Sequence, residues 1–175
     1  MSSVKSLLGQ TAIYGLPTIV GRLLNYFLVP LYTYFLPLDK YGIISELYAW
    51  VAFLIVLLTF GMETAFFKFF NDKTDKDEVF KNSFLTVLGI NLLFLLVLLF
   101  FNQHIADLLL YSDHNEYIVL LGIIVCIDAS SALPMAKLRS ENKALKFSLI
   151  HFTAIGANIS LNLIFFFFFY NESHP

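Results

Sequence analysis

Long apolar runs dominate this chain and limit what it can fold into. Five such runs, each of about 20 residues or more, are separated by short charged links. A helix of about 20 apolar residues is long enough to cross the hydrocarbon core of a bilayer. A lone strand in lipid would leave backbone groups without hydrogen bonds, and the alternation of a membrane barrel is absent. The runs therefore predict an integral membrane protein made of helices.

Composition excludes the main soluble classes. Of the 175 residues, 58% are hydrophobic and 14% are charged, whereas a soluble domain carries about 25% charged residues. The net charge of -2, with no basic tail, argues against a nucleic-acid partner. The single cysteine, Cys126, cannot form an intrachain disulfide, and no Cys/His spacing typical of a metal site is present. We expect no metal and no cofactor.

The spans and their orientation follow from the sequence. We predict an all-α, polytopic transmembrane bundle in a single domain, residues 1–175, with spans at about 7–36, 41–70, 82–101, 117–136 and 147–170. From the N-terminus onward, the segments outside the spans, with their flanks, contain 1, 1, 4, 0, 4 and 0 lysines or arginines. By the positive-inside rule the N-terminus is cytoplasmic and the C-terminus is outside. The third link contains "HIADLLLY", either a flat amphipathic helix or a loop tip dipping into the interface.

Polar groups recur at a similar depth in four of the spans. Ionisable residues inside a membrane usually face a cavity or a partner and are candidates for function. The candidates are Arg22 and Asn25 in the first span, Asn91 in the third, Asp128 in the fourth, and Asn158 and Asn162 in the fifth. Glu63 lies toward the cytoplasmic end of the second span. The pattern predicts a bundle around a polar, water-accessible cavity.

The charges inside the spans predict a pair and a binding role. Arg22 and Asp128 are the natural ion pair, because each would be costly alone in lipid. A guanidinium also suits phosphate or carboxylate recognition, so Arg22 is a candidate contact for an anionic substrate group. The alternative is that the asparagines and serines simply bond helices together.

Two cytoplasmic links contain charged motifs. Asp75 and Asp77 match the D-x-D motif of metal-dependent transferases, although a solvated link is the simpler interpretation. Arg139, Lys143 and Lys146 are spaced so that a continuous helix would place them on one face. They are candidates for capturing a lipid-linked diphosphate, and the alternative is a topology signal attracted to anionic lipid.

Several stretches, taken in order, resemble one family. "SLLGQTAIYGLPTIVGRLLNYFLVPLYT", "YGIISELYAWVAFLIVLLTFGMETAFFKF", "LPMAKLRSENKALKFSLI" and "NISLNLIF" resemble the polysaccharide-biosynthesis flippases of bacteria. These belong to the superfamily of multidrug-extrusion transporters and lipid II flippases. The resemblance covers essentially the whole chain.

The resemblance implies a fold and an activity. Members have twelve to fourteen helices in two lobes around a central cavity, and they move undecaprenyl-diphosphate-linked oligosaccharides across the bacterial inner membrane by alternating access. On this template the chain is an incomplete N-terminal lobe, and we expect it to be a piece of a longer transporter. The template also implies that Arg22, Glu63 and Asp128 face the cavity. Our hypothesis is that Arg22 contacts the diphosphate or the sugar, and that Asp128 and Glu63 orient Arg22 or carry a coupling proton.

The expected function is therefore a flippase with no catalytic residues. Its partners would be a lipid-linked oligosaccharide and membrane lipids, and its oligomeric state and coupling ion are open. A multidrug-type antiporter of the same superfamily is the alternative, although a central arginine argues against a cationic drug. A third possibility is a membrane-embedded glycosyltransferase or polymerase subunit that uses Asp75 and Asp77.

Overall fold

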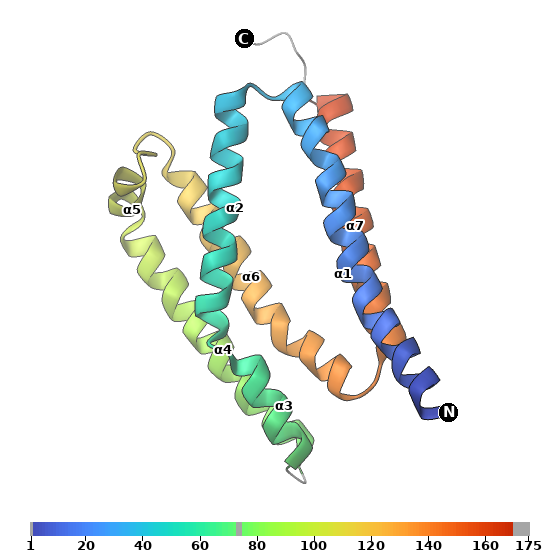
Figure 1. Ribbon diagram of the computed structural model, residues 1–175. Coiled ribbons are helices and arrows are strands. Elements are labelled where there is room, and N and C mark those ends of the chain that lie inside the picture. The colour runs from blue at the N-terminus through green and yellow to red at the C-terminus, as the bar shows by residue number, and fades with distance from the viewer. Residues whose placement is uncertain (1, 73–74, 170–175) are drawn as a thin grey trace. The chain divides into compact units, whose positions relative to one another are not determined.

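The described part of the chain is helical. The computed structural model describes residues 2–72 and 75–169, and the side chains of residues 14–71 and 75–168; it contains no strand in these ranges. All-helical architecture is thus confirmed for the described residues. Figure 1 shows the elements, which are, in chain order, α1 (Ser2–Phe35), α2 (Leu38–Thr59), α3 (Met62–Asp72), α4 (Lys76–Phe100), α5 (Asn102–Leu108), α6 (Asn115–Ser140), α7 (Ala144–Ile164) and a π-helical turn η1 (Phe165–Phe169).

Four helical segments are long and apolar enough to cross a membrane. They are Leu38–Asn71, Lys76–Phe100, Asn115–Ser140 and Ala144–Phe168, and they coincide with the second to fifth predicted spans. The last residue of the fifth predicted span, Tyr170, lies outside the described residues. The first predicted span is helical, as part of α1, but is not one of the four. Its crossing of the membrane, like the orientation of the N-terminus, stays a prediction.

The first of these four segments is bent. Phe60 and Gly61 have φ values of 49° and 62°, in the left-handed region that non-glycine residues rarely adopt, and they separate α2 from α3. Just before the bend, the Thr59 hydroxyl donates to the Ile55 carbonyl at 2.9 Å. Such back-bonding by Ser and Thr accompanies bends in helices. The predicted span 41–70 is therefore two helices, which the uniform apolar pattern concealed.

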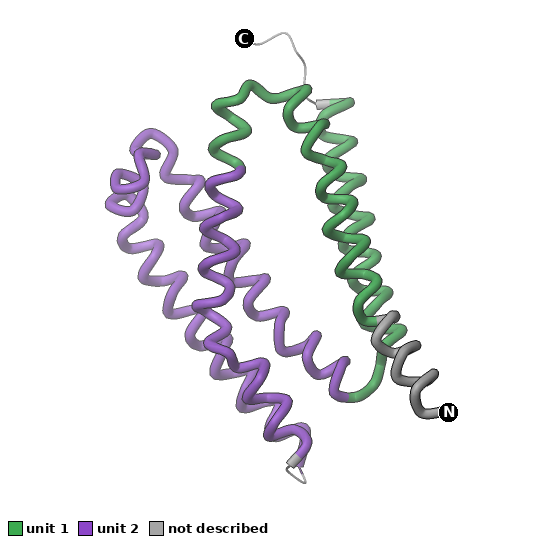
Figure 2. The backbone as a smooth tube through the Cα atoms, in the orientation of Figure 1, with its two compact units in different colours: residues 1–44, 141–175 green, residues 45–140 purple. Residues whose placement is uncertain are grey.

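By their internal contacts the helices form two compact units, shown in Figure 2. Unit 1 comprises residues 1–44 and 141–175, and so contains α1, α7 and the beginning of α2. Unit 2 comprises residues 45–140, and so contains the rest of α2 together with α3, α4, α5 and α6. Each unit has its own interior and is described by itself.

Unit 1 is built on a parallel pair of helices. Its register is fixed by contacts from Tyr14 to Phe147, from Gly21 to Ile155 and from Tyr32 to Asn162. Because the residue numbers rise together, α1 and α7 run in the same direction. A Cβ atom at Gly21 would lie 3.0 Å from Ile155 Cδ1. Small residues allow this close approach between membrane helices, whose association in lipid depends on packing.

Unit 2 is organised around α4 and α6, which pack along their length. The apolar cluster at the end that holds α3 has as its buried members Phe66, Phe70, Val79, Val87, Leu133 and Ala136. The cluster in the middle, beside α2, has Leu58, Leu121, Val125 and Ala129. The cluster at α5 has Leu98, Ala106 and Ile118. Phe66 has no exposed surface. Its ring packs α3 against α4 and α6. The bend therefore allows α3 to pack as a helix distinct from α2.

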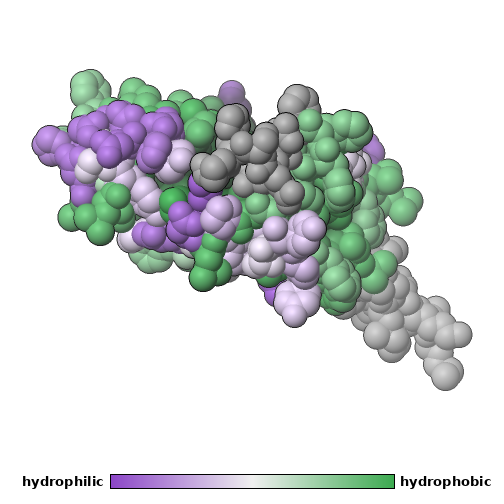
Figure 3. All heavy atoms as spheres, turned by 90° about the horizontal axis from the view of Figure 1, so that it is seen from above, coloured by the Kyte–Doolittle hydropathy of each residue, from purple (hydrophilic) through white to green (hydrophobic). Residues whose placement is uncertain are grey.

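The piece "HIADLLLY" contributes a short helix. The sequence left an amphipathic helix and a loop tip open, and the structure shows α5, with Ala106 fully buried and Leu108 81% exposed. In the view of Figure 3, hydrophilic residues gather at the left, the end of unit 2 that holds α5 and the turn after it, while apolar residues cover much of the remaining surface. This distribution fits an end at the interface and apolar sides in lipid.

Candidate functional site

Arg22, the charge in the middle of α1, lies on the surface of unit 1. It follows Gly21, so at about 100° per residue it is turned away from the stripe that packs on α7. Arg22 and Asn25 are both exposed, and neither has a hydrogen-bond or ion-pair partner among the described residues of unit 1. A cation in an apolar helix is costly in lipid. In lipid, Arg22 would therefore need water, a ligand or a partner other than the described residues of unit 1.

The two predicted amides of α7 belong to one hydrogen-bonded chain. The Tyr32 hydroxyl donates to Asn162 Oδ1 at 2.8 Å, and Asn162 Nδ2 donates to the Asn158 carbonyl at 2.9 Å. Asn158 is itself exposed. Tyr32 was missed by the sequence reasoning. Its spacing of seven residues from Asn25, which keeps both on one side of α1, is the signal that could have found it.

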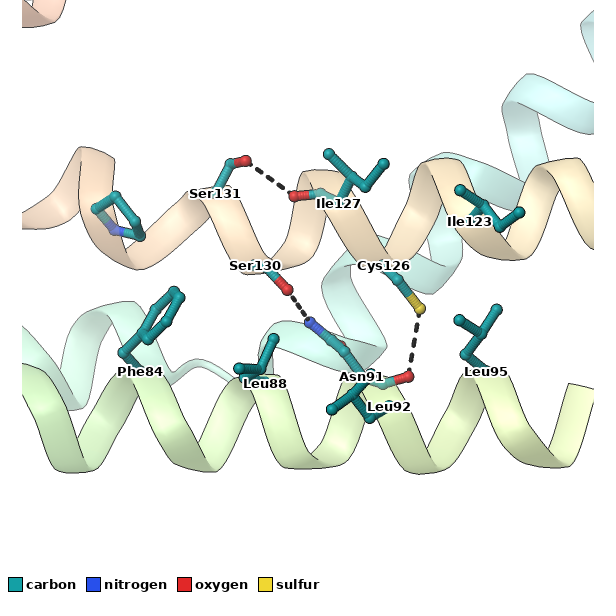
Figure 4. A pocket seen from close by; sticks show the side chains of 11 residues that line it. Phe84, Leu88, Asn91, Leu92, Leu95, Ile123, Cys126, Ile127, Ser130 and Ser131 are labelled. Atoms are coloured by element: carbon teal, nitrogen blue, oxygen red, sulfur yellow. Dashed lines mark hydrogen bonds between the residues drawn. The ribbon is translucent and has the colours of Figure 1, made fainter.

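Asn91 links α4 to α6 in the interior of unit 2, as Figure 4 shows. It is 1% exposed, its amide nitrogen donates to Ser130 Oγ at 3.0 Å, and its backbone carbonyl accepts from Cys126 Sγ at 3.3 Å. Bonds of this kind tie membrane helices together. Beside them runs a groove of about 470 Å³, lined mainly by apolar side chains of α4 and α6. The geometry supports the helix-bonding interpretation of Asn91.

Asp128 is exposed on α6 and has no hydrogen-bond or ion-pair partner among the described residues of unit 2. It belongs to unit 2 and Arg22 belongs to unit 1. The predicted Arg22–Asp128 ion pair therefore stays a prediction. Asp128 resembles Arg22 in being an exposed charge within a long apolar helix that has no partner among the described residues of its own unit.

Glu63 has a partner that the sequence did not indicate. It lies in the first turn of α3, where its carboxylate forms an ion pair with Arg139 in the last turn of α6. The Arg139 guanidinium also lies over the Phe67 ring, 5.3 Å from its centroid. Glu63 and Phe67 are four residues apart and so share one face of α3. They hold Arg139 from two sides and fasten α3 to the end of α6.

A second cation of α6 is held in the same way. Lys137 Nζ lies 2.8 Å from Asp77 Oδ1 and 4.4 Å from the centroid of the Phe80 ring, both on α4. Asp75 caps α4, since its Oδ1 accepts from the Glu78 backbone N–H at 3.0 Å. The two carboxylates of the D-x-D motif thus have structural partners. Among the described residues, no group of three or more His, Cys, Asp or Glu side chains is placed to hold a metal ion.

The single basic face predicted for Arg139, Lys143 and Lys146 is wrong. Helix α6 ends at Ser140, α7 begins at Ala144, and Asn142 between them has a φ of 56°. Lys143 precedes α7 and forms an ion pair with Glu141, whereas Lys146 is exposed within α7. The spacing assumed a continuous helix, and a left-handed turn interrupts it. Lys143 and Lys146 remain candidates for meeting a headgroup.

Comparison with known proteins places this arrangement in a family. A family model described as polysaccharide biosynthesis protein matches residues 7–170, which include every residue of the candidate site. The chain matches no protein of curated function and no solved structure. The apolar helices and the match together indicate a multi-pass membrane protein of polysaccharide biosynthesis, in agreement with the resemblance read from the sequence. The chain belongs to the polysaccharide biosynthesis protein family.

Proposed function

We propose that this protein is a flippase, or part of one, that moves an undecaprenyl-diphosphate-linked oligosaccharide across the bacterial inner membrane. The observation that carries the proposal is Arg22, an exposed cation in the middle of α1 with no partner among the described residues of its own unit. A guanidinium can bind a phosphate with two parallel hydrogen bonds. The diphosphate of the lipid carrier would therefore offset the cost of keeping Arg22 at membrane depth.

Further parts of the proposal concern the path and the orientation. The first predicted span, within α1, would cross the membrane as a fifth span, with the N-terminus in the cytoplasm, as the lysines and arginines predict. Lys143 and Lys146, at the start of α7, would meet the headgroup first. Glu63 is already engaged by Arg139, so Asp128 is the carboxylate that we propose for a coupling proton or for pairing with Arg22.

The alternatives have less support. An arginine facing the path disfavours a cationic drug, and the ion pair of Asp77 with Lys137 gives that carboxylate a structural role rather than a metal-binding one. Drug efflux without any effect on glycan export would favour a multidrug antiporter. Metal-dependent sugar transfer that Asp77→Ala abolishes would favour a glycosyltransferase or polymerase subunit.

Export of lipid-linked glycan in cells that produce Arg22→Ala tests the flippase. We expect export to fall at least tenfold at an unchanged protein level, because the loss of one charge-assisted hydrogen bond corresponds to about 1.5–3 kcal/mol. Arg22→Lys keeps the charge without the planar fork and should give an intermediate rate. Normal export by Arg22→Ala at a normal protein level would exclude this role for Arg22.

A further inference from the structure

One side of the α1/α7 pair carries a series of polar groups that change in character along its length. Counting about 100° per residue, Asn25 and Arg22 lie on one flank of the α1 stripe that packs on α7. On α7, Asn158 lies on a flank that is offset from the stripe that packs on α1 in the opposite rotational sense. Because the two helices are parallel and face each other, these two flanks are on the same side of the pair.

The register places these groups at neighbouring depths. Gly21 faces Ile155 and Tyr32 reaches Asn162, so Asn25 and Asn158 lie between these two levels. At 1.5 Å per residue, the series extends about 15 Å from Arg22 to Tyr32. It is long enough for a diphosphate and a short saccharide. We call Arg22, Asn25, Asn158, Asn162 and Tyr32 the α1/α7 polar strip.

The strip is charged only at one end. Between Arg22 and the end of α1 at Phe35 there is no Asp, Glu, Lys or Arg, and none occurs in residues 147–169. The remaining members are three amides and a phenol, which donate and accept hydrogen bonds without carrying charge. A diphosphate matches the guanidinium, whereas an uncharged, hydroxyl-rich group matches the rest.

We infer that the strip is a divided binding site, in which Arg22 holds the diphosphate and Asn25, Asn158 and Asn162 bind the uncharged sugar next to it. This inference rests on the flippase proposed above. Asn158 is exposed, and its Nδ2 donates no hydrogen bond within the described residues of unit 1. The Asn162 side chain is held by the Tyr32 hydroxyl at 2.8 Å. Tyr32 is thus a positioning residue for Asn162.

The test measures the affinity of the full chain, held in nanodiscs, for two probes whose short prenyl chains keep them soluble. One probe is farnesyl diphosphate, and the other is farnesyl diphosphate that carries one N-acetylglucosamine. We expect the sugar to increase the affinity of the wild type. Asn158→Ala should weaken the sugar-bearing probe by about threefold to tenfold, the range of one net hydrogen bond, and leave the sugar-free probe unchanged. Tyr32→Phe, which keeps the ring, should weaken only the sugar-bearing probe, by about twofold to threefold.

Ser160→Ala is the matched control, because Ser160 is exposed on α7 two residues from Asn158 but faces the other side of the helix. It should change neither affinity. The inference is overturned if the sugar adds no affinity, or if Asn158→Ala weakens both probes equally. Arg22→Ala separates the two proposals, since it should weaken both probes. If it weakens neither while the Asn158 effect persists, the strip binds sugar and the diphosphate role of Arg22 is wrong. If the wild type binds neither probe, both proposals fail.

Discussion

The arginines of the two units have different surroundings. In unit 2, Arg139 is paired with Glu63, and Lys137 with Asp77, each beside a phenylalanine ring of the partner helix. In unit 1, Arg22 is exposed and has no partner among the residues of that unit that the structure describes. The first arrangement joins helix ends, with the charges placed as the helix dipoles favour. The second arrangement leaves the charge of Arg22 available to bind a ligand. Removing Arg139 or Lys137 should therefore affect stability, whereas removing Arg22 should affect binding.

The largest expected effect on stability is a steric one, at the close contact that holds unit 1 together. In Gly21→Leu, the new side chain would overlap Ile155, since even a Cβ atom would lie 3.0 Å from its Cδ1. Overpacking of this kind costs about 1–3 kcal/mol. We expect a lower free energy of unfolding in mixed micelles, measured by circular dichroism. The polar strip should also lose probe binding, because its two helices would move apart.

Gly156→Leu provides the control for this substitution. A Cβ atom at Gly156 has no neighbour within 4 Å, so leucine is accommodated there, and the replacement of a helical glycine favours the helix. If Gly21→Leu and Gly156→Leu unfold with the same free energy, unit 1 does not depend on the approach of α1 to α7. The strip would then need another explanation.

The contrast between the two arginines can be tested directly. Arg139→Ala leaves Glu63 without its partner in a partly covered site, so we expect a loss of about 1–2 kcal/mol, less than for a fully buried pair. Arg22→Ala removes an uncompensated charge and should leave stability unchanged or slightly higher. A double-mutant cycle with Glu63→Gln and Arg139→Ala measures the coupling. A comparable loss in Arg22→Ala would show that Arg22 is structural, like Arg139.

A smaller effect is expected at the uncharged link between α4 and α6. Ser130→Ala removes the acceptor of the Asn91 amide. Interhelical hydrogen bonds in membranes average about 0.6 kcal/mol, so the free energy of unfolding should fall by about that amount, with transport unchanged. Ser131→Ala is the control, since its hydroxyl donates only to the Ile127 carbonyl of the same helix. A transport defect in Ser130→Ala at normal stability would show that the hydrogen bond between Asn91 and Ser130 serves transport and does not only join α4 to α6.

The sequence predicted the helices well because long apolar runs have few alternatives in a bilayer. The later four spans follow from such patterns, whereas for the α5 segment the sequence left a helix and a loop tip open. The bend at Phe60 and Gly61 was missed, since the hydropathy of that run is continuous. The partner of Glu63 was also missed, because it lies 76 residues away in the chain and depends on how α3 folds back. Spacing arguments worked only where the assumed helix was uninterrupted, and for Arg139 and Lys143 it was not.

The smallest effect is expected at an exposed link of unit 2. Tyr111, in the turn between α5 and α6, donates its hydroxyl to Glu46 Oε2 at 2.8 Å. Partial burial raises the pKa of Tyr111 from 10.0 to about 12, and the hydrogen bond to Glu46 contributes next. Because the folded pKa is the higher one, the folded state favours the protonated phenol. Its contribution is complete below pH 10 and is lost as the pH rises toward about 12.

Tyr111→Phe should therefore lower stability by less than about 1 kcal/mol at neutral pH, as for exposed polar pairs. The wild type should lose part of its stability between pH 10 and about 12 as the Tyr111 phenol ionises, and Tyr111→Phe should not show that part of the loss. The absorbance of tyrosinate, measured as wild type minus Tyr111→Phe, reports the titration of this one phenol among nine. A titration centred at pH 10 would mean that neither the partial burial of Tyr111 nor its contact with Glu46 persists in the folded protein. The contrast with unit 1 would then rest on the ion pairs that Glu63 and Asp77 form with Arg139 and Lys137.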